Sequence, residues 1–130
     1  MSNLAFDGMT PFTQVIVEHR KLEFSLDTGE TRSILYAPFA KAFPDIVKAT
    51  GHKESHKLTG LAGSSSYDSV VLPSVTLTLG GLDTRLAPAP VLVQESSDKS
   101  NLVFGNLGRD LLNQARTITF DFHAMTLDLQ

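Results

Sequence analysis

The sequence contains no cysteine and little excess charge of either sign. Without cysteine, the chain has no disulfide, no thiolate nucleophile and no cysteine-ligated metal site. Lysine and arginine together number 11 against 14 aspartates and glutamates, which gives a net charge of −3. The basic residues are scattered, and no run of them is flanked by aromatic side chains that stack on bases. Nucleic acid is therefore not expected as a partner.

Long hydrophobic runs are absent as well. No apolar stretch reaches the roughly 20 residues that cross a bilayer as a helix, so no membrane segment is expected in this chain. Residues 1–9 have neither a basic start nor an apolar centre, which argues against a signal peptide in this segment. The composition assigns no compartment, and a periplasmic location stays open if the sequence has been cut downstream of a signal.

The length of 130 residues, with 42% hydrophobic side chains, suits one compact domain with its own core. We expect residues 1–11 to be an N-terminal extension and residues 12–130 to form the domain. No internal repeat indicates a second lobe within the chain.

Apolar residues that alternate with polar ones, interrupted by turn residues at short spacing, predict many short strands. The predicted strands span residues 12–17, 22–26, 33–36, 70–79, 86–93, 102–104, 117–122 and 125–129. Prolines in the strand at 86–93 suit a sheet edge. One good helix is predicted at 109–115, and Pro44 breaks a weaker helical patch at 38–50 into short turns. This pattern favours an all-β, closed-barrel-like domain with one short helix near the C-terminus.

Polar segments between the predicted strands are expected to be loops. Residues 52–57 indicate a solvated polar stretch, and residues 94–101 indicate a polar loop. Residues 83–85 follow a Gly-Gly turn and are also expected to lie in a loop. Residues 59–67 are rich in glycine and serine, which predicts a mobile hairpin tip.

Two short motifs carry the chemistry of this sequence. The first is Asp-Thr-Gly at residues 27–29, at the end of an alternating apolar strand. The second is Gly-Arg-Asp-Leu-Leu at residues 108–112, near the other end of the chain. An Asp-Thr-Gly turn after a strand is often an ordinary capping turn, but it is also the pattern that carries one carboxylate of a catalytic pair, and the sequence holds only one such turn. The second carboxylate must therefore come from elsewhere.

The order of these parts resembles that of the retropepsin-like aspartic proteases, the single-lobe relatives of pepsin that occur in retroviruses and in many bacterial proteins. The resemblance spans residues 12–129 and rests on the two motifs together with the glycine-rich hairpin between them. It implies that Asp27 is the catalytic carboxylate and that Thr28 hydrogen-bonds to its counterpart across a two-fold axis. It also implies that Gly29 lets the backbone approach the substrate closely.

The resemblance gives roles to two further regions. The helix that begins with Gly108, Arg109 and Asp110 is expected to support the loop of Asp27 from beneath. A flap that closes over a bound peptide is expected at the hairpin tip, formed by Thr59, Gly60, Leu61, Ala62 and Gly63.

Glu30 departs from the family pattern, because the residue after Asp-Thr-Gly is usually alanine or serine. A carboxylate at this position could narrow the cleft, select basic or polar substrate side chains, or repel the negative charge of the catalytic pair. It could also mark a domain that no longer cleaves. Arg32 and Arg109 are the candidates to neutralise it.

The function implied by the resemblance is that of an aspartic endopeptidase active as a homodimer, with one Asp27 from each subunit. The paired aspartates activate a water that attacks the peptide bond, and no metal or cofactor takes part. The expected partners are a peptide or protein substrate and a second copy of the chain. Two alternatives stay open: one lobe of a longer two-lobed aspartic protease, and a catalytically silent peptide-binding module of the same fold.

Other patterns carry weaker signals. His52 and His56 have the four-residue spacing of helical metal ligands, yet charged residues surround them and no third ligand is evident, so a solvated face is favoured. The serines at 64–66 lack the Gly-x-Ser-x-Gly elbow of serine hydrolases. The Asp-Thr-Arg at 83–85 lacks the glycine of a second aspartic protease motif.

Overall fold

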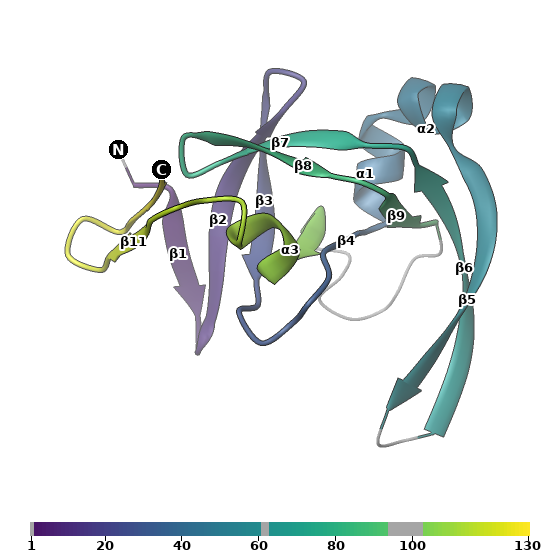
Figure 1. Cartoon of the computed structure of the whole chain (residues 1–130), viewed down its shortest axis with the longest axis horizontal. Helices are drawn as coiled ribbons and strands as arrows, with labels where there is room; N and C mark the ends of the chain where they lie inside the picture. The colour runs from purple at the N-terminus through teal and green to yellow at the C-terminus, as the bar shows by residue number, and fades with distance from the viewer. Residues whose placement is uncertain (1, 61–62, 94–102) are drawn as a thin grey trace.

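The computed structural model describes residues 2–60, 63–93 and 103–130, with the backbone alone for residues 54–60 and 63–68. Most of these residues lie in one large sheet. Its strands are β1 (Leu4–Asp7), β2 (Thr10–Val17), β3 (Arg20–Leu26), β4 (Ile34–Leu35), β5 (His52–Gly60), β6 (Gly63–Leu72), β7 (Val75–Leu79), β8 (Leu82–Leu86), β9 (Ala89–Leu92) and β10 (Gly105–Leu107). The strand order is β5-β6-β9-β4-β10-β3-β2-β7-β8, with β1 paired to β2 (Figure 1).

The all-β class predicted from the sequence is confirmed. Among the described residues the hydrogen-bonded path runs from β5 to β8 without closing on itself, so the sheet is open, which does not contradict a barrel-like fold (Figure 1). The strands predicted at 117–122 and 125–129 form a separate two-stranded sheet, the terminal hairpin of β11 (Ile118–Asp121) and β12 (Thr126–Leu129).

The hairpin of β2 and β3 follows directly from the sequence pattern. Leu22, Phe24 and Leu26 alternate with polar residues, and all three are buried in the core. Glu18 and His19 form the two-residue turn with positive φ angles, the conformation that matches the twist of a hairpin. Strand β3 therefore ends at Leu26 with its apolar face fixed, which places Asp27 at the strand end.

Strand β10, which comes late in the sequence, lies between β3 and β4, which come early in it. It runs parallel to β3, with Leu107 opposite Leu26, and antiparallel to β4. The strand predicted at 102–104 is wrong in position, since Val103 and Phe104 form a bend and the strand begins at Gly105. A Cβ at Gly105 would lie 2.6 Å from the Ile34 carbonyl oxygen, so the close approach of the strands there requires glycine.

The described residues contain three short helices, α1 (Ala37–Ala42), α2 (Pro44–Thr50) and α3 (Arg109–Leu112). Pro44 stands at the start of α2, where its missing N–H has no helical partner to lose, so the predicted break is confirmed. Helix α3 stops at Leu112 rather than at residue 115. None of the helices in the described part of the chain is long enough to span a membrane.

Strands β5 and β6 form a long hairpin that extends away from the rest of the sheet (Figure 1). Residues 52–57, expected to be a solvated polar stretch, belong to β5 and pair with β6 throughout, and His52 and Lys53 are exposed. The predicted hairpin at the glycine- and serine-rich segment is confirmed for its arms. Its tip, Leu61 and Ala62, lies outside the described residues.

Strands β8 and β9 correct two further predictions. Residues 83–85 are not a loop but part of β8, in register with β7. The prolines of the strand predicted at 86–93 were expected at a sheet edge, yet β9 lies between β6 and β4. Pro90 is in register with Val71, and the ladder between β9 and β4 is one residue pair, so few backbone N–H donors are needed from β9.

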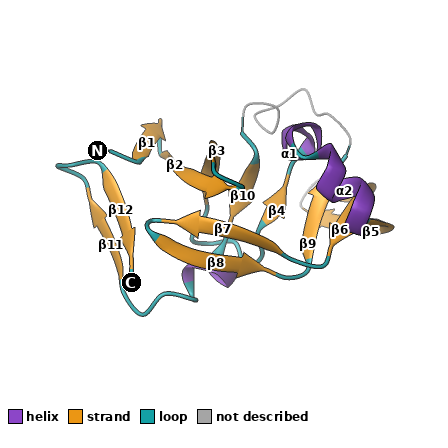
Figure 2. Cartoon of the chain, turned by 90° about the horizontal axis from the view of Figure 1, so that it is seen from above, coloured by secondary structure: helices purple, strands orange, loops and turns teal. Residues whose placement is uncertain are grey.

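The terminal hairpin docks on the main sheet through the turn between β7 and β8 (Figure 2). The Leu129 amide donates a hydrogen bond of 2.9 Å to the Gly80 carbonyl oxygen, and Leu127 and Leu129 join the core. Gly80 has φ +57°, and a Cβ there would lie 2.8 Å from the Leu129 side chain. Part of the expected N-terminal extension, β1, pairs with β2 in the same region.

Candidate active site

Asp27 lies at the end of β3, in the loop that leads to β4 (Figure 1). Its backbone amide donates a hydrogen bond of 2.9 Å to the Leu107 carbonyl oxygen, which extends the ladder with β10. The Gly29 amide donates to Asp27 Oδ1 at 3.0 Å, and the Glu30 amide donates to the Asp27 carbonyl oxygen at 3.1 Å. The turn therefore orients the carboxylate, whose residue is exposed to solvent.

The loop of Asp27 rests on the residues at the start of α3. The Arg109 amide donates to the Glu30 carbonyl oxygen at 2.9 Å, and the Asp110 amide donates to the Thr31 carbonyl oxygen at 3.1 Å. A Cβ at Gly108 would lie 2.6 Å from that same Glu30 oxygen, a distance that no side chain tolerates. Glycine at 108 is thus required for the loop and the helix to touch.

Ser33 is a site residue that the sequence reasoning missed. It is 2% exposed, and its amide and hydroxyl donate to the two oxygens of the Asp110 carboxylate at 2.9 and 2.6 Å. Its hydroxyl also accepts a bond of 2.9 Å from the Gly108 amide. The sequence does contain a signal for this contact: Ser33, a small hydroxyl residue, follows Asp-Thr-Gly closely, and Asp110 of the second motif can accept its hydrogen bonds.

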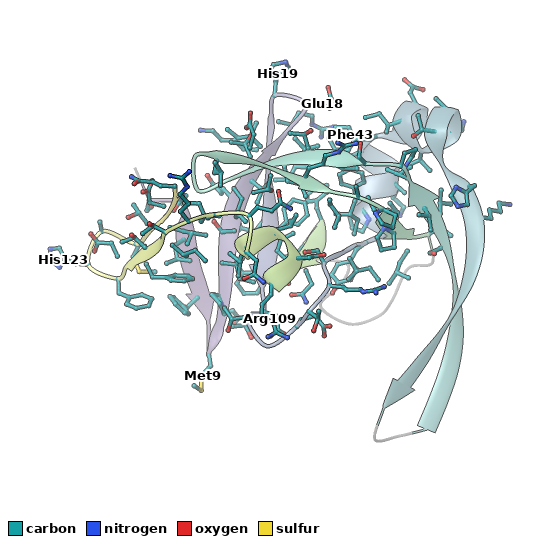
Figure 3. The ribbon with its side chains drawn as sticks, viewed as in Figure 1. Met9, Glu18, His19, Phe43, Arg109 and His123 are labelled. Atoms are coloured by element: carbon teal, nitrogen blue, oxygen red, sulfur yellow. The ribbon has the colours of Figure 1, made fainter. Side chains whose placement is uncertain are left out.

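The surface of the loop carries charge without ion pairs. Arg109 donates from Nη2 to the Thr31 hydroxyl at 3.0 Å and lies beside the loop in Figure 3. The Glu30 carboxylate accepts a bond of 3.2 Å from the Thr31 amide. Within the described residues, neither Arg32 nor Arg109 forms an ion pair with Glu30, so the exposed carboxylate is not neutralised by the expected arginines.

Gly29 has no need to be glycine within a single copy of the chain. Its φ lies outside the left-handed region, and an added Cβ would meet only Asp27 Oδ1, at an ordinary contact distance of 3.4 Å. Thr28 and Gly29 are both exposed. Any demand for glycine at this position therefore arises from something that covers the loop.

No protein-family model matches this chain, and no curated protein matches its sequence. Its backbone is nevertheless similar to solved structures. A retropepsin-like aspartic protease from Rickettsia conorii superimposes with a TM-score of 0.58 at 18% identity, over 91% of this chain and 82% of that one. The chain has the retropepsin-like fold.

Two further structures share this retropepsin-like fold. The retroviral protease-like domain of Ddi1 from Leishmania major matches with a TM-score of 0.56 at 10% identity, over 100% of this chain and 90% of that one. The EIAV protease complexed with the inhibitor HBY-793 matches with a TM-score of 0.51 at 23% identity, over 85% of this chain and 93% of that one. At these identities the likeness concerns the fold alone.

In this retropepsin-like fold the two sequence motifs lie together. Residues 27–33 and 108–112 touch through the hydrogen bonds described above, although about 80 residues of sequence separate them. The arms of the expected flap are in register, with Thr59 opposite Ser64 and Gly60 opposite Gly63. Leu61 and Ala62 of that flap lie outside the described residues.

The described part of the chain holds no group of three His, Cys, Asp or Glu residues arranged to bind a metal. His52 and His56 both lie in strand β5 and not in a helix, so their four-residue spacing does not place them on one helical turn.

Proposed function

We propose that this chain is an aspartic endopeptidase that acts as a homodimer, with one Asp27 from each copy. The observation that carries the proposal is an exposed Asp27, oriented by the Gly29 amide on a loop braced by α3. The retropepsin-like fold supports it, because one of its solved neighbours is an aspartic protease by name and another is a protease by name. The sequence has one Asp-Thr-Gly, so a complete carboxylate pair needs a second copy.

The chemistry of the proposed site needs two carboxylates in unlike states. Two close carboxyl groups share a proton, since both cannot ionise side by side. The ionised one takes a proton from a water held between them, and that water attacks the scissile carbonyl carbon. The protonated one hydrogen-bonds the oxyanion that develops. In a symmetric dimer the two copies of Asp27 exchange these roles freely.

The other site residues take roles around this pair. Thr28 would bond to the partner loop, and Gly29 would leave room for the substrate backbone. The hairpin tip at 59–63 would close over an extended peptide, which a sheet-like cleft holds through backbone hydrogen bonds. Glu30, exposed beside Asp27, would favour substrates with a basic side chain near the scissile bond.

Glu30 also supports a second candidate function, that of a peptide-binding module without hydrolysis. A further carboxylate that no arginine neutralises would disfavour the ionised state of the pair. A longer two-lobed protease remains the other way to supply the second aspartate. Both candidates differ from the homodimer in measurable ways.

The deciding experiment combines sedimentation equilibrium with cleavage of a mixed-sequence peptide library analysed by mass spectrometry. We expect a monomer–dimer equilibrium and cleavage by the wild-type chain, and a loss of cleavage by about a thousandfold or more in Asp27→Asn. Asp128→Asn, an exposed aspartate on β12, is the matched control and should cleave normally. A strictly monomeric chain that does not cleave would overturn the homodimer, whereas a dimer that binds peptides without cutting them would identify the silent module.

A further inference from the structure

A groove of about 490 Å³ lies behind the loop of Asp27, between that loop, α3 and the strands β8 and β9. We call it the arginine groove. Its lining includes Arg32, Val71, Arg85, Leu86, Asp110 and Gln114. It is separate from the exposed surface of Asp27, Thr28 and Gly29, none of which lines it.

The two arginines of the groove have no side-chain partner among the described residues. Among the described residues, no hydrogen bond or ion pair involves the guanidinium of Arg32 or of Arg85, and both residues are exposed. The one carboxylate in the groove, that of Asp110, already accepts three hydrogen bonds, from the Ser33 amide, the Ser33 hydroxyl and the Leu111 amide. Two exposed arginines therefore line a groove in which the carboxylate of Asp110, the one acid among its described lining residues, already accepts other hydrogen bonds.

The backbone around both arginines is fixed to the region of α3. Gln114 accepts a bond of 2.9 Å from the Arg85 amide and donates one of 2.8 Å to the Arg85 carbonyl oxygen. Arg32 lies between Thr31, whose carbonyl is bound by the Asp110 amide, and Ser33, which is bound by the Asp110 carboxylate. This arrangement lowers the cost of binding, because the positions that carry the cations are ordered before a ligand arrives.

The floor of the groove is apolar. Val71 and Leu86 are 6% and 4% exposed, and Pro88 and Pro90 line the same groove. A ligand that fits must carry carboxylates toward the arginines and apolar or backbone groups toward the floor. Guanidinium groups bind carboxylates through paired hydrogen bonds, which makes arginine suited to this recognition.

We propose that the arginine groove binds an acidic peptide segment, with its carboxylates on Arg32 and Arg85. The chain as a whole carries a net charge of −3, so general attraction of acids is not expected and the recognition is local. This inference goes beyond the proposed hydrolysis, since Asp27, Thr28 and Gly29 do not line the groove and binding there requires no cleavage.

The test is fluorescence anisotropy with a fluorescein-labelled octapeptide of alternating glutamate and leucine. The comparison peptide has glutamine in place of each glutamate. We expect the full chain to bind the glutamate peptide, and Arg32→Gln and Arg85→Gln each to weaken that binding by about fivefold to tenfold. Arg116→Gln removes the same charge from an exposed position outside the groove and should bind as the wild type does.

Two further measurements keep the outcome decisive. Asp27→Asn should bind the glutamate peptide normally, so that binding can be measured without cleavage of the probe. Two-dimensional NMR of the wild-type chain should show shifts of the Arg85 amide and the Gln114 side-chain amide on titration with the peptide. The proposal is overturned if the glutamine peptide binds equally well, if Arg116→Gln weakens binding as much as the groove variants, or if those two NMR signals do not move.

Discussion

Asp110 and Ser33 are joined by two hydrogen bonds, of 2.6 and 2.9 Å, although they lie 77 residues apart in sequence. The contact links helix α3 near the C-terminus to the loop of Asp27 near the N-terminus. Both of its donors come from Ser33, which is buried. The loop of Asp27 is therefore held by a partly buried carboxylate that lies in a different element, helix α3.

Replacing Asp110 with asparagine should weaken this link. The amide side chain can accept at one oxygen only, and its NH₂ group would face a donor, so one charge-assisted bond is lost and another polar group is left unpaired. We expect the free energy of unfolding to fall by about 2–3 kcal/mol in urea denaturation. The control, Asp128→Asn at an exposed position, should change it by less than about 0.5 kcal/mol. Equal effects of the two variants would argue against the link.

Gly29 and Gly108 should respond differently to alanine. Alanine at 108 places its Cβ against the Glu30 carbonyl, and we expect a loss of at least about 2 kcal/mol in stability. Alanine at 29 fits within a single copy and should leave stability within about 0.5 kcal/mol. If the proposed function holds, Gly29→Ala nevertheless abolishes cleavage or dimerisation. A fully active Gly29→Ala protein would show that nothing covers the loop closely.

Ser69 offers a test of the fold away from the site. Its hydroxyl is buried and has no hydrogen-bond partner within the described part of the chain, so it contributes a desolvation penalty without a compensating bond. Ser69→Ala should leave stability unchanged or raise it by up to about 1 kcal/mol.

The matched comparison for Ser69 is Thr84, whose buried hydroxyl donates to the Leu77 carbonyl at 2.7 Å. Thr84→Val should lower stability by about 1–2 kcal/mol in the same denaturation assay. A reversed order of the two variants would contradict the hydrogen-bond assignment at both positions.

Mixing wild-type chains with Asp27→Asn chains distinguishes a homodimer from a site completed within one copy. At concentrations where the chain is fully dimeric, random exchange with an equal amount of the variant lowers the number of wild-type homodimers to about half. We expect the rate of peptide cleavage to fall by the same factor. Mixing with Asp128→Asn should not lower it, and an unchanged rate with Asp27→Asn would rule out a site shared between copies.

Glu30→Gln tests the proposed selectivity. Glutamine keeps the oxygen that accepts the Thr31 amide, so the loop should hold its conformation while the charge disappears. We expect the preference for a basic side chain near the scissile bond to fall by about fivefold. The measurement is the ratio of kcat/KM for two peptides that differ only by lysine against glutamine. An unchanged ratio would exclude Glu30 as the source of selectivity.

The strands and helices that could be predicted are those whose pattern of apolar, polar and proline residues lies within the element itself. Leu22, Phe24 and Leu26 alternate cleanly, and Pro44 marks its helix start directly. Strand β10 was misplaced because Gly105 and its neighbours have no strand pattern of their own. The strand exists because glycine fits against Phe24 and the Ile34 carbonyl, a contact that only the assembled sheet supplies.

Long-range hydrogen bonding likewise limited what the sequence revealed about the site. The Asp-Thr-Gly and Gly-Arg-Asp motifs identified Asp27 and Asp110, and their proximity followed from the resemblance. Ser33 has no local signature, since its importance comes from bonds to residues at 108 and 110. Arg32 and Arg85 come from a loop and from strand β8, and the sequence pattern predicts a loop rather than a strand at residues 83–85.

The exposure of Asp27 in a single copy has a consequence for regulation. If each complete site needs two chains, a dilute population holds few such sites, and doubling the number of chains then about quadruples them. The rate of substrate cleavage in a cell would then rise with about the square of the protein concentration rather than in proportion to it. Synthesis and degradation of the protein would then themselves switch its activity on and off.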